Sequence, residues 1–350
     1  MSNNTLNIQL PAEWHPQAAV MLTWPHAETD WKPILQEIIP CYVAIAKEIL
    51  RREKLIIVCS SITDVKSALR KEVDYSRILF CKIPSNDTWA RDHGPVSIFI
   101  DGRPSVLDFT FNGWGLKFPA NLDNQITRRL YQSGVFDSAV KYHNLKDIVL
   151  EGGSIESDGQ GTILTTAQCL LAPNRNEYQD TEEVTDYLKL LFGARQVLWL
   201  HHGYLAGDDT DSHIDTLARF CNPETIAYVR CTDETDEHFA ELSRMEKELQ
   251  TFRTLEGKPY RLIPLPMAEA VYDAGERLPA TYANFLIIND AVLMPTYDSP
   301  FDEVAKAALQ TAFPDREIVG VNCLPLIKQH GSLHCVTMQI PQEFLYPIID

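Results

Sequence analysis

Polar loops that follow short apolar strands carry a set of side chains that together suit one reaction. The set comprises Cys335, His213, Asp92, Glu151 and Asp215. A thiolate is the strong nucleophile available near neutral pH, and a histidine can move protons there. Carboxylates can hold a planar, cationic guanidinium through paired charges and bidentate hydrogen bonds. If these loops meet, the residues predict nucleophilic hydrolysis of a guanidine, with ammonia expelled and an S-alkylthiouronium then hydrolysed by water.

Each of these residues, taken alone, also has an ordinary structural interpretation. Cys335 could be a buried structural thiol, and His213 could cap the strand that follows it. Asp92 could form a surface ion pair with Arg91, and Glu151, which precedes two glycines, could cap a turn. The chemistry therefore depends on whether the fold brings loops together that are far apart in the chain.

Helical patterns and short apolar strands alternate about five times along the chain. The clearest helices are expected near residues 180–193, 236–252 and 302–314, and strands follow them at 196–200, 260–265 and 317–321. Earlier helices are expected within 31–52 and 122–134. The pairs Asp101-Gly102, Asp158-Gly159 and Asn289-Asp290 indicate hairpin turns. Alternating helices and strands place the chain in the α/β class.

The polar loops recur at similar intervals, which indicates repeated units. They are centred near Trp89, Glu151, His213, Asn284 and Cys335, so successive centres lie 62, 62, 71 and 51 residues apart. Five units that cannot each close a core favour radial packing about an axis, with all five loops aimed at one central point. A doubly wound sheet is the alternative. Because no flexible linker divides the chain, residues 1–350 are expected to form a single catalytic domain.

Charge and composition restrict the classes of function. The 350 residues include 31 lysines and arginines against 48 aspartates and glutamates, a formal net charge of −17. This acidity disfavours nucleic acid and anionic membranes as partners and favours small cations. No basic segment followed by an apolar run opens the chain, and no apolar stretch approaches the ~20 residues of a membrane helix, so we expect a cytoplasmic protein. The eight cysteines form no CxxC pair and are expected to be reduced.

Several segments resemble, in the same order, the agmatine deiminase and bacterial-type peptidylarginine deiminase family of the guanidino-group-modifying (pentein) superfamily. The resemblance covers nearly the whole chain. Its segments read PAEWHPQAAVMLTWPHAETDW at 11–31, NDTWARDHGP at 86–95, LEGGSIESDGQGTILTTAQCLLAPNRN at 150–176, GDDTDSHIDTLARF at 207–220 and HCVTMQIP at 334–341. It implies a five-bladed α/β propeller, a small cationic guanidine as substrate with agmatine favoured, and no metal or organic cofactor. It is also compatible with a homodimer.

The resemblance further implies a role for each matched residue of the site. These roles are nucleophile for Cys335, acid and base for His213, guanidinium binding for Asp92, Asp215 and Glu151, and pocket lining for Trp89 and Asn284. The expected reaction converts agmatine and water to N-carbamoylputrescine and ammonia, a step of putrescine and polyamine biosynthesis.

Two stretches depart from the agmatine deiminase pattern and leave the substrate open. The pattern Gly-Gly-Gly-Asn-Ile-His-Cys reads Gln-His-Gly-Ser-Leu-His-Cys at 329–335, and Ser212 and Thr216 flank the His-x-Asp pair. These changes touch the expected pocket rim, so peptidyl-arginine, free arginine or another alkylguanidine are alternative substrates. Arg91 or Arg175 could then meet the carboxylate of arginine. A non-catalytic propeller is disfavoured because the thiol and imidazole are both present, and no flanking signature supports a thiol peptidase.

Overall fold

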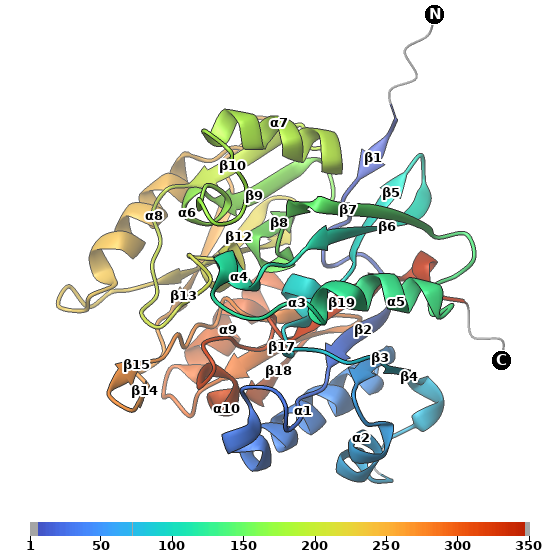
Figure 1. Cartoon of the computed structure of the whole chain (residues 1–350). Helices are drawn as coiled ribbons and strands as arrows, with labels where there is room; N and C mark the ends of the chain where they lie inside the picture. Colours follow the sequence, from blue (N-terminus) through green and yellow to red (C-terminus); the bar gives the residue numbers. More distant parts are fainter. Residues whose placement is uncertain (1–5, 72, 347–350) are drawn as a thin grey trace, which may run out of the picture.

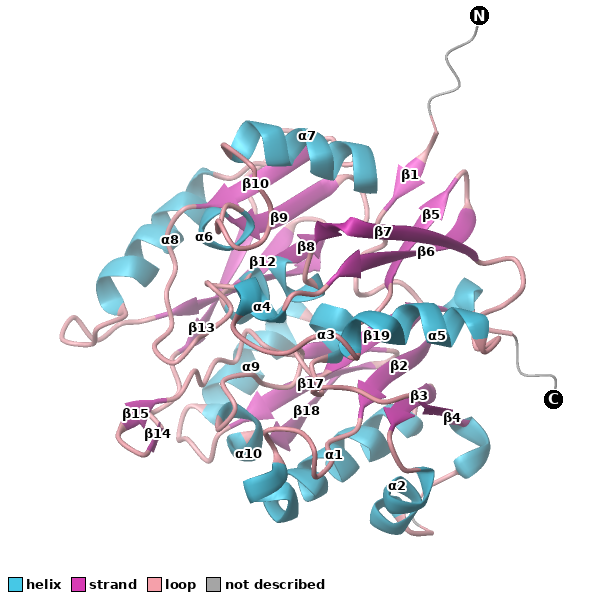
Figure 2. Ribbon diagram, viewed as in Figure 1, coloured by secondary structure: helices cyan, strands magenta, loops and turns pink. Residues whose placement is uncertain are grey.

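The computed structural model describes residues 6–71 and 73–346, and there the chain forms five mixed sheets around a common centre (Figure 1). Each sheet repeats one pattern. Two strands pair antiparallel, and a third strand pairs parallel with the second after a helix has connected them. Helices α1 (Leu35–Leu50), α7 (Thr181–Phe192) and α8 (Phe239–Thr251) lie at the periphery (Figure 2). The prediction of a five-bladed α/β propeller is confirmed.

The strands of the five sheets follow the chain in order, apart from the last sheet. The first sheet contains β1 (Ile8–Gln9), β5 (Val96–Ile100), β6 (Arg103–Thr110) and β7 (Lys141–Val149). The next three contain β8 (Ile155–Ser157), β9 (Thr162–Thr166) and β10 (Gln196–Leu200); β11 (Ala218–Asn222), β12 (Thr225–Arg230) and β13 (Arg261–Pro266); and β16 (Leu286–Ile288), β17 (Ala291–Thr296) and β18 (Glu317–Asn322).

The fifth sheet joins the two ends of the chain. It contains β19 (Thr337–Pro341), β2 (Gln17–Thr23), β3 (Lys54–Cys59) and β4 (Ile78–Lys82). β19 pairs antiparallel with β2, with Thr337 opposite Leu22, so the ring of sheets is closed by strands more than three hundred residues apart. A separate two-stranded ribbon is formed by β14 (Tyr272–Asp273) and β15 (Glu276–Arg277).

The remaining helices are mostly short and lie between the strands. They are α2 (Ile62–Leu69), α3 (Ala90–His93), α4 (Gly113–Leu116), α5 (Ile126–Gln132), α6 (Ala167–Leu170), α9 (Asp302–Ala312) and α10 (Leu324–Ile327). Over residues 6–71 and 73–346, no helix combines the length and the apolar character that crossing a membrane requires. All eight cysteines are buried free thiols.

The local sequence explains the start, the end and the buried face of α7. The Asp180 side chain accepts hydrogen bonds from backbone N–H groups of the first turn, which caps the helix. Gly193 ends it with φ of 67°, a left-handed conformation that glycine adopts without strain. Val184, Leu188 and Phe192, four residues apart, form one buried face. This cap and this periodicity allowed α7 to be predicted from the sequence.

The polar loops run between neighbouring sheets and meet near the centre. Each loop leaves the last strand of one sheet and enters the first or second strand of the next. The loop after β4 contains α3, the loop after β7 contains the 3-10 turn Gly152–Ser154, and the loop after β10 contains the 3-10 turn Ile214–Thr216. α3 contacts the first of these turns, which in turn contacts the second. The fold thus brings together side chains about sixty residues apart in sequence.

Candidate active site

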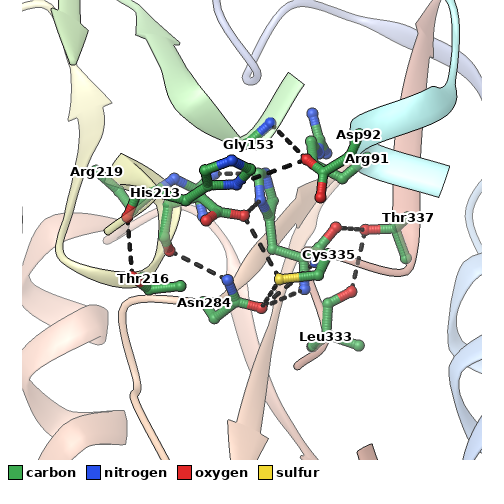
Figure 3. Close-up of polar contacts among 12 residues, drawn as sticks. Arg91, Asp92, Gly153, His213, Thr216, Arg219, Asn284, Leu333, Cys335 and Thr337 are labelled. Atoms are coloured by element: carbon green, nitrogen blue, oxygen red, sulfur yellow. Dashed lines mark hydrogen bonds and ion pairs between the residues drawn. The ribbon is translucent and has the colours of Figure 1, made fainter. Parts of the chain in front are cut away.

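Cys335 lies two residues before β19, among polar side chains from several loops (Figure 3). Its side chain is 5% exposed. The Sγ atom lies 3.7 Å from Oδ2 of Asp215 and 3.4 Å from Oδ1 of Asn284. Its backbone carbonyl accepts a hydrogen bond from the N–H of Arg91, at 3.1 Å, which ties the loop to α3. The thiol is therefore fixed between three of the five predicted loops.

The surroundings of Cys335 oppose formation of a thiolate in the unliganded protein. Burial, followed by the negative charges of Asp215 and Asp92, raises the pKa of the thiol well above its usual value. A hydrogen bond with Asn284 acts in the opposite direction and is outweighed. The resting nucleophile is consequently a protonated thiol.

His213 is a buried, neutral imidazole that lies beside Asp92. Its Nδ1 lies 3.7 Å from Oδ1 of Asp92, and its Nε2 has no hydrogen-bond partner among the described residues. Burial lowers the pKa of the ring to about 3, although the negative charge of Asp215 acts to raise it. A ring nitrogen of His213 and a carboxylate oxygen of Glu151 lie within 4.8 Å of each other. A neutral histidine in this position can accept a proton from a nearby donor.

Asp92 and Glu151 are buried carboxyl groups whose environment disfavours their charged form. Asp92 accepts hydrogen bonds from the N–H of Gly153 at 3.0 Å and from Nε1 of Trp114 at 2.9 Å. Burial, and then repulsion from Asp215 and Glu151, raises the pKa of Asp92 well above its usual value. Burial also raises the pKa of Glu151, although Arg175 donates to both of its oxygens at 2.9 and 3.0 Å. The pair is suited to a ligand that brings positive charge.

Asp215 differs from these two carboxyl groups because a histidine supports its charge. Its Oδ2 accepts a hydrogen bond from Nδ1 of His334 at 2.7 Å, while its Oδ1 has no partner among the described residues. Burial is the largest effect and acts to raise the pKa of Asp215, but the hydrogen bond with His334 and the electrostatic attraction of His334, His213 and Arg219 together outweigh it, so the pKa is lowered. Asp215 therefore offers an ionised oxygen next to Cys335.

Gly153 shows how closely three of these groups converge. A Cβ atom at this position would lie 2.7 Å from Nδ1 of His213, 2.9 Å from Oδ1 of Asp92 and 3.1 Å from Oδ2 of Asp215. Contacts below 3.0 Å require neighbouring atoms to move, so only glycine leaves this arrangement undisturbed. Gly153, the second glycine after Glu151, therefore leaves room for these three side chains to converge, a role that its position in a turn did not indicate.

A pocket of about 400 Å³ leads from the surface to Cys335 and Asp92. Aromatic side chains form part of its wall: Trp89 meets Trp114 edge to face, with ring centroids 6.0 Å apart, and Phe118 also lines it. His213, Glu151, Asp215 and Asn284 do not line the pocket and are 0 to 1% exposed. Asn284 instead holds the nucleophile loop, because its Oδ1 accepts the N–H of His334 at 2.9 Å.

The arginines considered as carboxylate binders are engaged elsewhere. Arg175 is buried and, besides Glu151, its Nη1 contacts Oδ2 of Asp211 at 2.6 Å. Arg91 points into a different cavity and pairs with Glu13, whose Oε1 lies 3.1 Å from Nη1. The alternative of a surface ion pair between Arg91 and Asp92 is not formed. Neither guanidinium can meet a substrate carboxylate in this arrangement.

Three supporting residues went unrecognised in the sequence: Glu13, Arg219 and Trp114. Nδ1 of His334 contacts Asp215, and Nε2 of the same ring lies 2.7 Å from Oε1 of Glu13 and 2.9 Å from Nη2 of Arg219. Arg219 is fully buried, also pairs with Glu156, and lies in the apolar strand β11. A charged residue inside an apolar strand was a usable signal, because it requires a buried partner.

Comparisons with known proteins agree in family and fold. The model of the Porphyromonas-type peptidyl-arginine deiminase family matches residues 9–341. The agmatine deiminase of Pseudomonas aeruginosa (strain LESB58) is 31% identical, over 95% of each chain. Among solved structures, a Porphyromonas gingivalis protein provisionally named arginine deiminase is 56% identical with a TM-score of 0.93, covering 97% of this chain and 100% of that one. The substrate-bound C. jejuni agmatine deiminase is 38% identical with a TM-score of 0.90, covering 97% and 98%.

Proposed function

Since the chain belongs to the Porphyromonas-type peptidyl-arginine deiminase family, we propose that it hydrolyses agmatine to N-carbamoylputrescine and ammonia, with Cys335 as nucleophile. One observation carries this proposal. A buried thiol, a neutral imidazole and an ionised carboxylate converge at the end of a pocket that contains further carboxylates. This combination can bind a guanidinium and attack its central carbon.

In the proposed complex, the guanidinium compensates the carboxyl groups that are unfavourable in the empty site. Asp92 and Asp215 would accept hydrogen bonds from its N–H groups. Glu151, which pairs with Arg175, would add negative charge near the bound cation. Removing a guanidinium from water is costly unless its charge is paired and its N–H groups are hydrogen-bonded. The buried carboxylates meet both requirements. Trp89 and Trp114 would flank the alkyl chain.

The first chemical step would transfer the thiol proton from Cys335 to His213 as sulfur attacks the guanidinium carbon. The bound cation lowers the pKa of the thiol, and the carboxylates stabilise the imidazolium that forms. His213 then returns this proton to the departing nitrogen, so that ammonia leaves and an S-alkylthiouronium remains on Cys335. The substrate supplies the positive charge throughout, so no net charge is created in the buried site.

The second step would hydrolyse this covalent intermediate. Water replaces ammonia, and neutral His213 accepts one of its protons as the oxygen attacks the thiouronium carbon. The C–S bond then breaks, the sulfur of Cys335 recovers a proton from His213, and the remaining proton leaves with the solvent. The ureido product is neutral at the reacting group, so it no longer pairs with Asp92 and Asp215, which favours its release.

The preference for agmatine over arginine is supported by the charges that line the pocket. Four aspartates, Asp30, Asp87, Asp92 and Asp209, line it together with His330, and no lysine or arginine does so within the described part of the chain. We expect kcat/KM for agmatine to exceed that for free arginine by at least about 100-fold, because the α-carboxylate would be placed near these aspartates. Colorimetric detection of ureido product with agmatine, arginine and a blocked arginine peptide tests this. Faster turnover of either arginine compound would overturn the agmatine assignment.

Alkylation of Cys335 should depend on a bound guanidinium. At pH 7.5 we expect iodoacetamide to inactivate the unliganded protein at least about 10-fold more slowly than it alkylates a free thiol, because little thiolate is present. Addition of millimolar methylguanidine, which is too short to fill the pocket, should accelerate inactivation. Raising the pH should also accelerate it, because the raised thiol pKa leaves the thiolate as the minor form well above neutrality. Equal rates with and without methylguanidine would contradict substrate-assisted activation.

A further inference from the structure

A second cavity, of about 610 Å³, lies apart from the pocket that leads to Cys335. Among the described residues, none lines both spaces. Neighbouring residues of α3 face the two spaces, because Arg91 lines the second cavity and Asp92 lines the catalytic pocket. The walls of the second cavity include the apolar residues Leu10, Val96, Ile155 and Met338. The hydrolysis proposed above makes no use of this cavity, which has the size of a site for a small organic molecule.

Three polar side chains that line the second cavity each retain an atom without a hydrogen-bond partner among residues 6–71 and 73–346. These atoms are Nε of Arg91, Oε1 of Gln17 and Oγ of Ser97. The three residues are only 5 to 8% exposed, so contact with bulk water does not satisfy them. A buried polar atom without a partner is costly, and such atoms are rare in folded proteins. Three of them around one cavity indicate a place where a polar group of a ligand can bind.

The other polar atoms of Arg91 and Gln17 are already engaged and hold the two side chains in place. Nη1 of Arg91 lies 3.1 Å from Oε1 of Glu13. Nε2 of Gln17 donates to the backbone oxygens of Glu13 at 2.8 Å and Ile287 at 3.0 Å. Because both of those oxygens can only accept, the amide nitrogen of Gln17 must face them, and Oε1 is left as an acceptor. The cavity therefore offers a fixed N–H donor and a fixed oxygen acceptor, and the Ser97 hydroxyl can act as either.

The charged side chains that line the second cavity already have partners of opposite charge. The pairs are Arg91 with Glu13, Glu156 with Arg219, and His15 with Glu343. A ligand with a net charge would bring an unpaired charge into a largely buried space, which is costly. The cavity therefore favours an uncharged ligand.

We propose that the second cavity binds a small uncharged molecule that carries an amide group, as in a carboxamide or a urea, on a short apolar chain. The carbonyl oxygen of the ligand accepts a hydrogen bond from Nε of Arg91, and an N–H of the same group donates to Oε1 of Gln17. The apolar chain packs against Leu10, Val96 and Ile155, where its removal from water favours binding. A carboxylate offers no N–H to Gln17, and an ammonium offers no acceptor to Arg91, so neither satisfies both side chains. This site is distinct from the one proposed to hydrolyse guanidines and does not depend on that activity.

The experiment titrates the full-length native protein with valeramide in a calorimeter, and with valerate as the charged analogue of the same shape. We expect saturable binding of one valeramide per chain, with a dissociation constant of about 1 mM, and binding of valerate at least about 10-fold weaker. Equal or tighter binding of valerate would overturn the amide assignment. Absence of saturable valeramide binding up to about 20 mM would overturn the site itself, because the cavity would then hold only water.

A variant that fills the cavity locates the binding. Ser97→Phe, in β5, places a ring in the space and should weaken valeramide binding at least about 10-fold. Ser67→Phe is the matched control, because Ser67 lies exposed in α2 and this variant should bind valeramide as the native protein does. Cooperative thermal unfolding shows that each variant is folded. Native affinity in a folded Ser97→Phe would place the ligand elsewhere and overturn the proposal.

A crystal structure of the native protein with valeramide decides the case in which Ser97→Phe does not fold. We expect the amide group within hydrogen-bond distance of Nε of Arg91 and Oε1 of Gln17. Valeramide bound only in the pocket of Cys335 and Asp92 would overturn the proposal. None of these measurements uses agmatine turnover, so failure of the second site and failure of the proposed hydrolysis are separate results.

Discussion

A Cys335→Ser variant is expected to hydrolyse agmatine at least about 10⁴-fold more slowly than the native protein, while it still binds the substrate. The serine hydroxyl occupies almost the same volume but is a much weaker acid and a poorer nucleophile than the thiol. The groups proposed to hold the guanidinium, Asp92 and Asp215, are unchanged by the substitution. Ureido product formation measures the loss, and calorimetric titration with agmatine measures the retained binding.

The control for this variant is a buried thiol outside the site. Cys81 lies in β4 and is 8% exposed, so Cys81→Ala should leave turnover within about 3-fold of native. Substantial activity in Cys335→Ser would contradict the proposed mechanism. It would direct attention to Cys169, whose Sγ lies within 4.8 Å of ligand atoms of Glu151 and His213. Mass spectrometry of acid-quenched native enzyme adds a direct criterion, because the covalent intermediate should map to the peptide that contains Cys335.

Much of the fold could be predicted because its signals are local. The cap at Asp180, the four-residue spacing of Val184, Leu188 and Phe192, and the left-handed Gly193 are all encoded within one helix. The hairpin pair Asp101-Gly102 has φ of 50° and 72°, as its residue types indicate. The repetition of such units made radial packing recognisable. Pairing of β19 with β2 was not predicted, because it depends on strands at opposite ends of the chain.

The grouping of the site residues could be predicted from the sequence, but their individual contacts could not, because these contacts join loops from the whole ring of sheets. The structure brings Cys335, His213, Asp92 and Asp215 together, which their loop positions had indicated. The directions of the side chains could not be predicted. No local pattern shows that Arg175 turns inward to Glu151, and the choice is decided by the buried carboxylate that it must neutralise.

The partners within buried networks of hydrogen bonds and ion pairs could not be predicted from the sequence. His334, which precedes the nucleophile in the chain, joins Asp215 to Glu13 through the two nitrogens of its ring. Glu13 and Arg219 are more than two hundred residues apart in the sequence, yet their side chains form an ion pair. Each also has further partners, Arg91 for Glu13 and Glu156 for Arg219, so the role of either residue depends on the whole network.

Replacement of His213 by glutamine is expected to lower kcat for agmatine about 10³-fold with little change in KM. Glutamine preserves a polar side chain of similar reach but cannot exchange a proton. Binding should persist because the proposed guanidinium ligands are Asp92, Asp215 and Glu151. Since burial holds the His213 pKa at about 3, the ring is already neutral from pH 6 to 9, and the loss should be constant across that range. The half-buried His143 provides the control, because His143→Gln in β7 should retain turnover within about 3-fold.

The first turnover of His213→Gln can separate the two proton transfers assigned to this ring. If the imidazole is needed to protonate the leaving nitrogen, ammonia release should be slowed together with ureido formation, and no thiouronium should accumulate on Cys335. If it were needed only to activate water, ammonia would appear rapidly in an amount equal to the enzyme while the covalent adduct persisted. We expect the first result, because the thiol is protonated at rest and the neutral ring of His213 can accept the initial proton. A raised KM with unchanged kcat would instead make His213 a binding group and exclude it from the proton transfers.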